Sequence, residues 1–242
     1  MKAVILAAGK GSRLGNLTDL TPKCMLPLNN KHTLLSLNFS MLKELKTIDS
    51  IILITGFEAH KLEVYAKKLS EFYHLPIEIV YNPFWNHCNV LGSFYMGFDK
   101  IDDDFIFMHA DTLVEIDVLK ALAITKKDIC LAVDFKNCGE EEMKFWLEGG
   151  KIKRITKENL NTKANGEFVG VAKFEKKMIP YLKENTKKIF QDGNLNDYME
   201  KVIDRGLINN ELEIGYFDAS YYKTIEVDFQ KDYEAAKQLF GK

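Results

Sequence analysis

Residues 3–13, AVILAAGKGSR, decide the fold and the position of the site. The stretch begins with a continuous apolar run, which is typical of a parallel strand covered on both faces. The run ends in Gly9-Lys10-Gly11, and glycines let the backbone turn sharply and approach a ligand closely. Free backbone N–H groups in such a turn can bind phosphate oxygens, and Lys10 and Arg13 add positive charge. The stretch therefore predicts a strand followed by an anion-binding turn.

Two well-known phosphate-binding patterns do not fit this turn. The pattern G-x-G-x-x-G requires glycine at position 14, which is Leu14 here, and the Gly-Lys-Ser/Thr ending of the P-loop does not follow. The missing third glycine argues against a nicotinamide-dependent dehydrogenase. Taken alone, GKG is also compatible with an ordinary glycine turn whose charges are solvated.

Composition limits the class of protein. The chain has 242 residues, of which 46% are hydrophobic and 28% charged, as in ordinary soluble proteins. Its net charge of −2 lacks the basic excess that nucleic-acid binders usually carry. No apolar run approaches the roughly 18 residues of a membrane span, and Met1 is not followed by a secretory leader. The four cysteines form no C-x-x-C pair. We expect a cytoplasmic protein without nucleic-acid or membrane partners.

Strand-like and helix-like segments alternate along the first half of the chain. This order predicts an α/β fold with a mostly parallel central sheet and helices on both faces. The strands are expected over residues 3–7, 51–55, 77–81, 105–108 and 129–133, and the helices over 33–45, 58–72, 91–98 and 116–124.

The pattern changes after residue 134. We expect one domain, 1–242, with a core of residues 1–134 and 213–242 and a small lid of hairpin and helices over 135–212. The expected elements are a hairpin over 145–155, strands at 167–174, 213–217 and 224–227, and helices at 178–184, 195–204 and 229–239.

Two linked motifs near the N-terminus resemble a known family. Residues 6–14 read LAAGKGSRL and residues 22–27 read PKCMLP. They are similar to the signature L-A-A-G-x-G-[ST]-R-L, followed by P-K-x-x-[LM]-P, of the nucleotidyltransferases that activate sugar phosphates and phosphocholine. The resemblance extends over the whole chain, more loosely after residue 135. It implies a Rossmann-like nucleotidyltransferase fold, in which a phosphorylated acceptor attacks the α-phosphate of a nucleoside triphosphate and releases pyrophosphate.

The same resemblance implies a role for the residues of the two motifs. Lys23 is expected beside the α-phosphate or the acceptor phosphate, where it and Arg13 act as the catalytic cations. Such transfers depend mainly on positioning and charge neutralisation. A solvated loop lysine is the alternative for Lys23. The residues expected to bind the nucleotide in the first motif are Leu6, Ala7, Ala8, Gly9, Lys10, Gly11, Ser12 and Arg13.

A triphosphate substrate suggests Mg²⁺, which prefers carboxylate, phosphate and water oxygens. Asp111 follows a predicted strand and matches the family's metal-binding aspartate, and Asp228 matches a second one near the C-terminus. Glu226 lies two residues before Asp228 and therefore shares its face of a strand. A helix N-cap is the alternative for Asp228. We expect Ala110 to contact the nucleotide and His109 to be a packed neighbour of the site.

The stretch YNPFWNHCNVLGSFYMG, residues 81–97, predicts which base is bound. It resembles the phosphocholine cytidylyltransferase branch of the family, with Asn82, Asn89 and Ser93 at matching positions. Amide groups can read the edge of a base because they donate and accept hydrogen bonds. This favours CTP over UTP or TTP. The alternative is that the aromatics are core residues and the asparagines belong to turns.

The acceptor is less defined. Trp146 and Tyr216 are candidates to surround a quaternary ammonium, and Lys144 is a candidate to meet an anion. The small lid suits a phosphocholine-like molecule, a phosphonate, or a phosphorylated amino acid or amide such as phosphoglutamine. Because CDP-linked groups commonly decorate bacterial surface polysaccharides, that pathway is our working hypothesis.

The sequence is thus interpreted as a Mg²⁺-dependent cytidylyltransferase whose partners are CTP and a small phosphorylated acceptor. One alternative is a sugar-1-phosphate uridylyl- or thymidylyltransferase. The other is a non-catalytic nucleotide-binding regulatory subunit. The oligomeric state, with a homodimer among the options, is left open.

Overall fold

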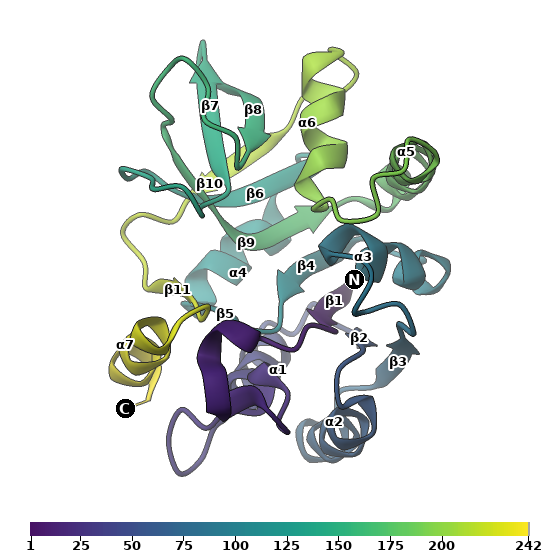
Figure 1. Ribbon diagram of the computed structural model, residues 1–242, viewed down its shortest axis with the longest axis vertical. Coiled ribbons are helices and arrows are strands. Elements are labelled where there is room, and N and C mark those ends of the chain that lie inside the picture. The colour runs from purple at the N-terminus through teal and green to yellow at the C-terminus, as the bar shows by residue number, and fades with distance from the viewer. Residues whose placement is uncertain (242) are drawn as a thin grey trace.

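A single large sheet organises the molecule. The structure is a computed structural model that describes residues 1–241, and its main path of strands runs β10-β6-β9-β4-β1-β2-β3 (Figure 1). Strand β9 is antiparallel to its neighbours β4 and β6, and the other neighbouring pairs on this path are parallel. The α/β fold with a mostly parallel central sheet is as predicted. These strands are β1 (Lys2–Ala7), β2 (Ser50–Thr55), β3 (Ile77–Tyr81), β4 (Phe105–His109), β6 (Ile129–Asp134), β9 (Gly166–Phe174) and β10 (Gly215–Asp218).

Helices cover both faces of this sheet. Val4 and Leu6 of β1 pack into a core cluster shared with α3, α5 and α6, whereas Ile5 packs into a second cluster on the opposite face with α1, α2 and α4. Because successive strand residues point to opposite faces, β1 must be apolar at every position. The helices are α1 (Leu34–Glu44), α2 (Ala59–Tyr73), α3 (Val90–Gly97), α4 (Ile116–Ile124), α5 (Ile179–Gln191) and α6 (Glu200–Ile208).

The segment 135–212, expected as a lid, contains more than peripheral elements. The predicted hairpin is present as β7 (Lys144–Glu148) and β8 (Lys151–Thr156). Strand β9 of the same segment, however, lies between β4 and β6 in the main sheet. A boundary between core and lid therefore passes through the sheet, and the lid role of the segment stays a proposal.

Two helices of this segment differ from their predicted bounds. Helix α5 continues to Gln191 instead of ending near residue 184, because Thr186 and Ile189 extend its buried face. Helix α6 begins at Glu200 and not at residue 195. The backbone of the segment before Glu200 binds the start of α3 instead of forming a helix, because the carbonyls of residues 195 and 197 accept hydrogen bonds from Asn89 N and Leu91 N at 3.3 and 3.2 Å.

A small antiparallel pair brings the C-terminal region beside the main sheet. Strand β5 (Thr112–Val114) follows β4 and pairs with β11 (Thr224–Glu226), and α7 (Gln230–Phe240) follows. The pairing aligns Glu226 with Thr112, so residues 224–229 lie next to the carboxyl end of β4. Short 3₁₀ helices complete the fold: η1 (Ser12–Thr18), η2 (Lys23–Met25), η3 (Phe98–Lys100) and η4 (Lys176–Met178).

The helices of the described residues were compared with the length and apolar character that a membrane span requires. Within residues 1–241, every helix is too short or too polar to cross a bilayer.

Candidate active site

The glycine turn (residues 8–13) follows β1 at the carboxyl edge of the sheet, where α/β proteins bind ligands. Gly11 has a φ of +69°, in the left-handed region that favours glycine. A Cβ at this position would lie only 3.0 Å from the Cβ of Lys23. Thr18 Oγ1 donates to the Gly11 carbonyl at 2.9 Å. Gly11 thus permits both the turn and the close approach of Lys23.

Lys23 contacts two carboxylates that are far away in the sequence. Its ammonium forms ion pairs with Asp111 and with Asp228, the latter at 3.0 Å. Burial opposes the charge on Lys23, but the two carboxylates outweigh it and raise the pKa of the ammonium. Burial also opposes the charge of Asp111, yet Lys23 and His109 lower the pKa of that carboxyl. The charges of Lys23 and Asp111 therefore stabilise each other at a site where both side chains are mostly buried.

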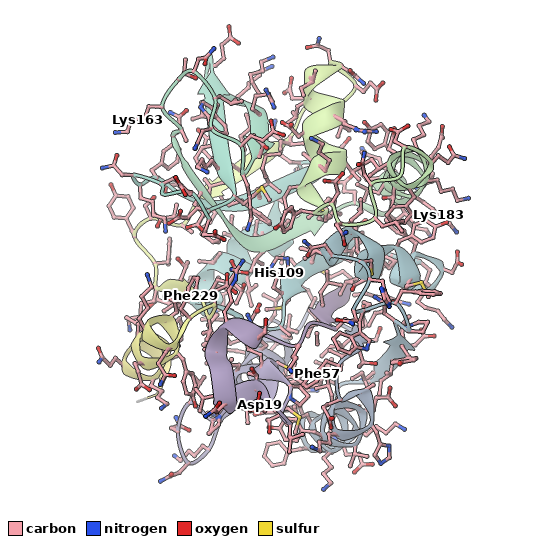
Figure 2. All side chains as sticks on the ribbon, in the orientation of Figure 1. Asp19, Phe57, His109, Lys163, Lys183 and Phe229 are labelled. Carbon is pink, nitrogen blue, oxygen red and sulfur yellow. The ribbon has the colours of Figure 1, made fainter. Side chains whose placement is uncertain are left out.

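Arg13 extends the charged cluster from Asp228 to Glu141. Its guanidinium contacts Asp228 and Glu141, each at 3.2 Å, and lies over the ring of Phe229 at 5.4 Å from the centroid. Figure 2 shows Phe229 and His109 between two parts of the molecule: the part that contains β7, β8 and α6, and the part that contains the glycine turn, α1 and α2. Arg13 is still 46% exposed, so it can reach a ligand in the space between those parts.

His109 ends β4 and faces the C-terminal strand. Its Nδ1 lies 3.2 Å from Glu226 Oε1. Burial lowers the pKa of the imidazole, but Glu226 outweighs this effect and raises the pKa to about 9. Within residues 1–241, its buried Nε2 finds no hydrogen-bond partner. His109 therefore orients Glu226 through one nitrogen and keeps the other free.

The carboxylates of this cluster suit a divalent metal ion. Ligand atoms of His109, Asp111 and Glu226 lie within 4.8 Å of one another. Asp111 also converges with Asp228 on the ammonium of Lys23, so a positive charge is already accommodated between them. Mg²⁺ prefers oxygen ligands. Asp111, Asp228 and Glu226 therefore fit Mg²⁺ better than the imidazole of His109 does.

A cavity of about 680 Å³ opens in front of these residues. It runs from the glycine turn and the start of α3 to β6, β9 and the start of α6. A smaller pocket of about 110 Å³ adjoins it at the turn, lined among others by Ala7, Gly11, Lys23 and Ala110. Of the residues expected from the sequence, those that line the large cavity are Leu6, Ala8, Gly9, Arg13, Asn89, Ser93, Asp111, Glu226 and Asp228.

Two residues of the turn point elsewhere. The Lys10 ammonium lies over the ring of Phe57, 5.5 Å from its centroid, and Ser12 is an exposed residue that begins η1. Their binding to a nucleotide stays a prediction.

Asn82 is fully buried behind the cavity wall. Its Nδ2 donates to Ser93 Oγ at 3.0 Å and contacts Cys88 Sγ at 3.4 Å, and its Oδ1 accepts from Phe84 N at 2.9 Å. These contacts occupy the amide, so Asn82 supports the wall instead of facing a base. Asn89 Oδ1 accepts from Val90 N and begins α3.

The three residues expected around the acceptor lie outside the cavity lining formed by residues 1–241. Lys144 is 3% exposed, and its ammonium donates to the carbonyls of residues 140 and 157 at 3.1 and 2.7 Å. Trp146 Nε1 donates to the Thr162 carbonyl at 2.9 Å. Tyr216 packs against Phe135 and Phe145. Each has a structural contact in place of a free face, which explains the departure from the prediction.

Other side chains take their place in the cavity wall. Lys136 lies 2.5 Å from Glu167 and 3.9 Å from Asp134, and the Lys157 ammonium lies over the ring of Tyr198 at 4.6 Å. The remaining charged lining residues at this end include Glu140, Glu142 and Glu200. The signal available in the sequence was weak: Lys136, Lys157 and Glu167 stand at or just beyond the ends of predicted strands.

Comparison with known proteins assigns the class. A model of the MobA-like NTP transferase domain matches residues 3–147, more than half of the chain. The chain belongs to this family and is a nucleotidyltransferase, as the resemblance implied.

Individual relatives are more distant. The choline-phosphate cytidylyltransferase of Streptococcus pneumoniae is 22% identical over 244 residues, covering 99% of this chain and 98% of the relative. The CTP:phosphoglutamine cytidylyltransferase of Campylobacter jejuni is 24% identical over 262 residues, covering 96% and 100%. Uridylyl- and guanylyltransferases also match. A solved structure of the S. pneumoniae CTP:phosphocholine cytidylyltransferase superimposes with a TM-score of 0.79, at 23% identity over 98% of this chain and 97% of the other.

Proposed function

We propose that this protein is a Mg²⁺-dependent cytidylyltransferase that transfers CMP from CTP to a small phosphorylated acceptor and releases pyrophosphate. One observation supports the proposal most: Lys23 contacts both Asp111 and Asp228 beside the glycine turn (residues 8–13). Carboxylates for a metal, a cation for phosphate oxygens and backbone donors thus converge at one edge of the sheet. This is the equipment that transfer of a phosphoryl-type group requires.

The reaction joins the acceptor phosphate to the α-phosphorus of CTP. An oxygen of the acceptor phosphate forms the new P–O bond, and the bond from the α-phosphorus to the bridging oxygen breaks, so that oxygen leaves with pyrophosphate. Negative charge builds on the leaving group. Lys23 and Arg13, which contact carboxylates in the free protein, exchange these partners for phosphate oxygens and neutralise that charge.

Asp111 and Asp228, with Glu226 beside them, are proposed to hold Mg²⁺. Bound there, the ion would withdraw charge from the phosphate oxygens. His109 fixes the orientation of Glu226 through the 3.2 Å contact to its Oε1. The protein side of the mechanism is therefore to position the two substrates and to hold charges at fixed places.

The preference for CTP is supported by two kinds of observation. Asn89 and Ser93 line the cavity next to Trp85, which places polar groups beside an aromatic face. In the free protein, Asn89 Oδ1 accepts from Val90 N and its Nδ2 donates to the Asn196 carbonyl at 3.4 Å, so reading a base requires Asn89 to exchange these partners. Two full-length relatives carry cytidylyltransferase names. A uridylyltransferase from Synechocystis, of which the chain covers 56%, keeps the sugar-phosphate alternative as an outcome of the test.

We infer that the acceptor is a small phosphorylated metabolite of the phosphocholine, phosphonate or phosphorylated amino acid kind, and that its CDP-linked product is made in the cytoplasm for the decoration of surface polysaccharides. The cavity of about 680 Å³ is of the size typical of small-molecule sites, roughly 300–1,000 Å³.

The test is pyrophosphate release with Mg²⁺ and each of CTP, UTP, TTP and ATP, against a panel of small phosphorylated amines, polyol phosphates and sugar 1-phosphates. We expect CTP to give the highest kcat/KM with a small acceptor. Turnover confined to UTP or TTP with a sugar 1-phosphate would replace the proposal by the sugar-phosphate alternative. Absence of release together with absence of CTP binding would overturn catalysis altogether.

A further inference from the structure

Glu200 is a buried carboxylate without an ion pair in the wall of the cavity. It is the first residue of α6, is 2% exposed and lines the cavity. Its Oε2 has no hydrogen-bond partner within residues 1–241. Burial raises the pKa of the Glu200 carboxyl, and a buried oxygen that lacks a donor is costly. A ligand that brings a donor to this oxygen would remove the cost.

Glu200 enters the cavity at the first residue of α6, where the charges of His109, Glu226 and Lys157 act on its carboxylate. Figure 1 shows α6 beside β7 and β8, in the opposite half of the molecule from the turn after β1. Asp204 fixes the helix on β8, because its carboxylate accepts from Arg154 at 2.8 and 3.0 Å and from Ile155 N at 2.9 Å. If the turn holds the triphosphate, as proposed above, we place the acceptor in the part of the cavity that Glu200 lines beyond His109 and Glu226.

This end of the cavity is more negative than a phosphorylated substrate alone requires. Asp134 and Glu167 already neutralise Lys136 between them. Further carboxylates line the same end, Glu200 among them. Lys157 also lines this cavity. Burial raises the pKa of Glu167 and of Glu200, and a positive charge on the rest of the acceptor would favour the ionised form of these carboxylates.

Two rings of the cavity lining, those of Tyr198 and Phe229, are covered by protein cations, and Trp85 is assigned to the base above, whereas a quaternary ammonium needs open ring faces. Lys157 lies over the ring of Tyr198 at 4.6 Å, and Arg13 and Lys231 lie over Phe229 at 5.4 and 5.7 Å. Protein cations thus occupy these faces already. A carboxylate oxygen without a partner, by contrast, needs an N–H donor.

Resting on the proposed cytidylyltransferase function, we propose that the acceptor carries a primary, secondary or tertiary ammonium, and that an N–H of this group donates to Glu200. The site discriminates against a quaternary ammonium, which has positive charge but no N–H. Specificity of this kind is steep, because the wrong ligand leaves the buried oxygen unpaired.

A methylation series of acceptors tests the proposal. Pyrophosphate release is measured with CTP, Mg²⁺ and phosphoethanolamine, its N-methyl and N,N-dimethyl derivatives, or phosphocholine. The first three carry N–H donors and the last does not. We expect kcat/KM to change by less than about tenfold along the first three, and to fall about 10- to 100-fold at phosphocholine. Equal use of phosphocholine, or use of 2-hydroxyethyl phosphate in preference to phosphoethanolamine, would overturn the proposal.

The variant Glu200→Gln separates binding from a structural role. It keeps the shape of the side chain but removes its charge. We expect KM for phosphoethanolamine to rise about 10- to 100-fold and KM for CTP to stay within about threefold. Glu148→Gln, an exposed glutamate at the end of β7, is the matched control and should change neither. An unchanged KM for the amine, or an equal rise in both KM values at an unchanged unfolding midpoint, would contradict the proposal.

Failure of this inference differs from failure of the proposed function. CTP-dependent release with an acceptor that has no ammonium would refute the amine and keep the cytidylyltransferase. CTP binding by titration calorimetry, without turnover of any amine in the series, would also refute the amine. Neither CTP binding nor turnover would refute both.

Discussion

The two ends of the cavity differ in how their charges are balanced. At the glycine turn, Lys23 and Arg13 are paired with carboxylates from distant parts of the chain. At the start of α6, Glu200 is buried, and its Oε2 lacks a partner in the part of the chain that the structure describes. The first end thus supplies its own counter-charges, which phosphate and metal can replace. At the second end, the charges of His109 and Lys157 act on Glu200, but its Oε2 lacks a hydrogen-bond donor, which the ligand is proposed to supply.

The largest loss of activity is expected from removal of Lys23 at the paired end of the cavity, the end next to the glycine turn where cations and carboxylates are paired. Lys23→Ala removes the cation that is proposed to meet the phosphate oxygens, and we expect kcat/KM for CTP to fall about 10²- to 10³-fold. Steady-state pyrophosphate release measures it. Lys67→Ala, which removes an exposed lysine of α2, is the control and should keep wild-type rates. Near-normal turnover of a folded Lys23→Ala protein would remove Lys23 from the mechanism.

Asp111→Ala removes a negative charge at the same end of the cavity, the end next to the glycine turn. It takes away a proposed Mg²⁺ ligand, so we expect kcat to fall about 10²- to 10³-fold, with a higher Mg²⁺ concentration needed for half-maximal rate. A magnesium titration of the initial rate measures both quantities. If the Mg²⁺ dependence matched that of the wild type, Asp111 would not be a metal ligand.

Asp204→Ala tests how firmly α6 is held at the other end. The variant leaves Arg154 and the Ile155 N–H without the acceptor that they share, at a position that is 1% exposed. We expect the free energy of unfolding to fall by about 3 kcal/mol in urea denaturation. Asp192→Ala breaks an exposed pair with Arg205 on the same helix and should cost less than about 1 kcal/mol. Equal effects of the two variants would mean that Asp204 does not fix α6.

The smallest expected effect is a pH dependence of stability, and it arises from the contact between His109 and Glu226. The pKa of His109 is raised to about 9 by Glu226, against the lowering caused by burial. A raised pKa contributes stability that is complete below the ordinary value near 6.5 and is lost as pH rises through about 9. We expect metal-free protein to lose stability between these values, and His109→Gln to lose less. Parallel pH profiles of the two proteins would contradict the pairing.

The sequence predicted the paired end far better than the other. Its residues belong to motifs that resemble those of the nucleotidyltransferases, and this resemblance, together with the position of Asp111 after a strand, predicted that Lys23, Asp111 and Asp228 act at one site. The other end is assembled from single residues at the ends of β6, β8 and β9 and at the start of α6. Lys144 and Trp146 looked available in the sequence because nothing in it reveals the carbonyls that they bind.

Local context also explains the errors in the helices. The segment before Glu200 has helical spacing, yet its carbonyls accept hydrogen bonds from Asn89 and Leu91 at the start of α3. Tertiary hydrogen bonds of this kind are invisible to periodicity. They matter for function, because they set where α6 begins and therefore where Glu200 enters the cavity.

The most direct test of the account follows the phosphorus atoms by ³¹P NMR in a mixture of wild-type protein, CTP, Mg²⁺ and phosphoethanolamine. The account predicts that one pyrophosphate appears for each CDP-linked product, as the phosphomonoester signal of the acceptor converts to a diphosphate signal. Loss of CTP with an unchanged acceptor signal, or the same conversion with UTP in place of CTP, would contradict it.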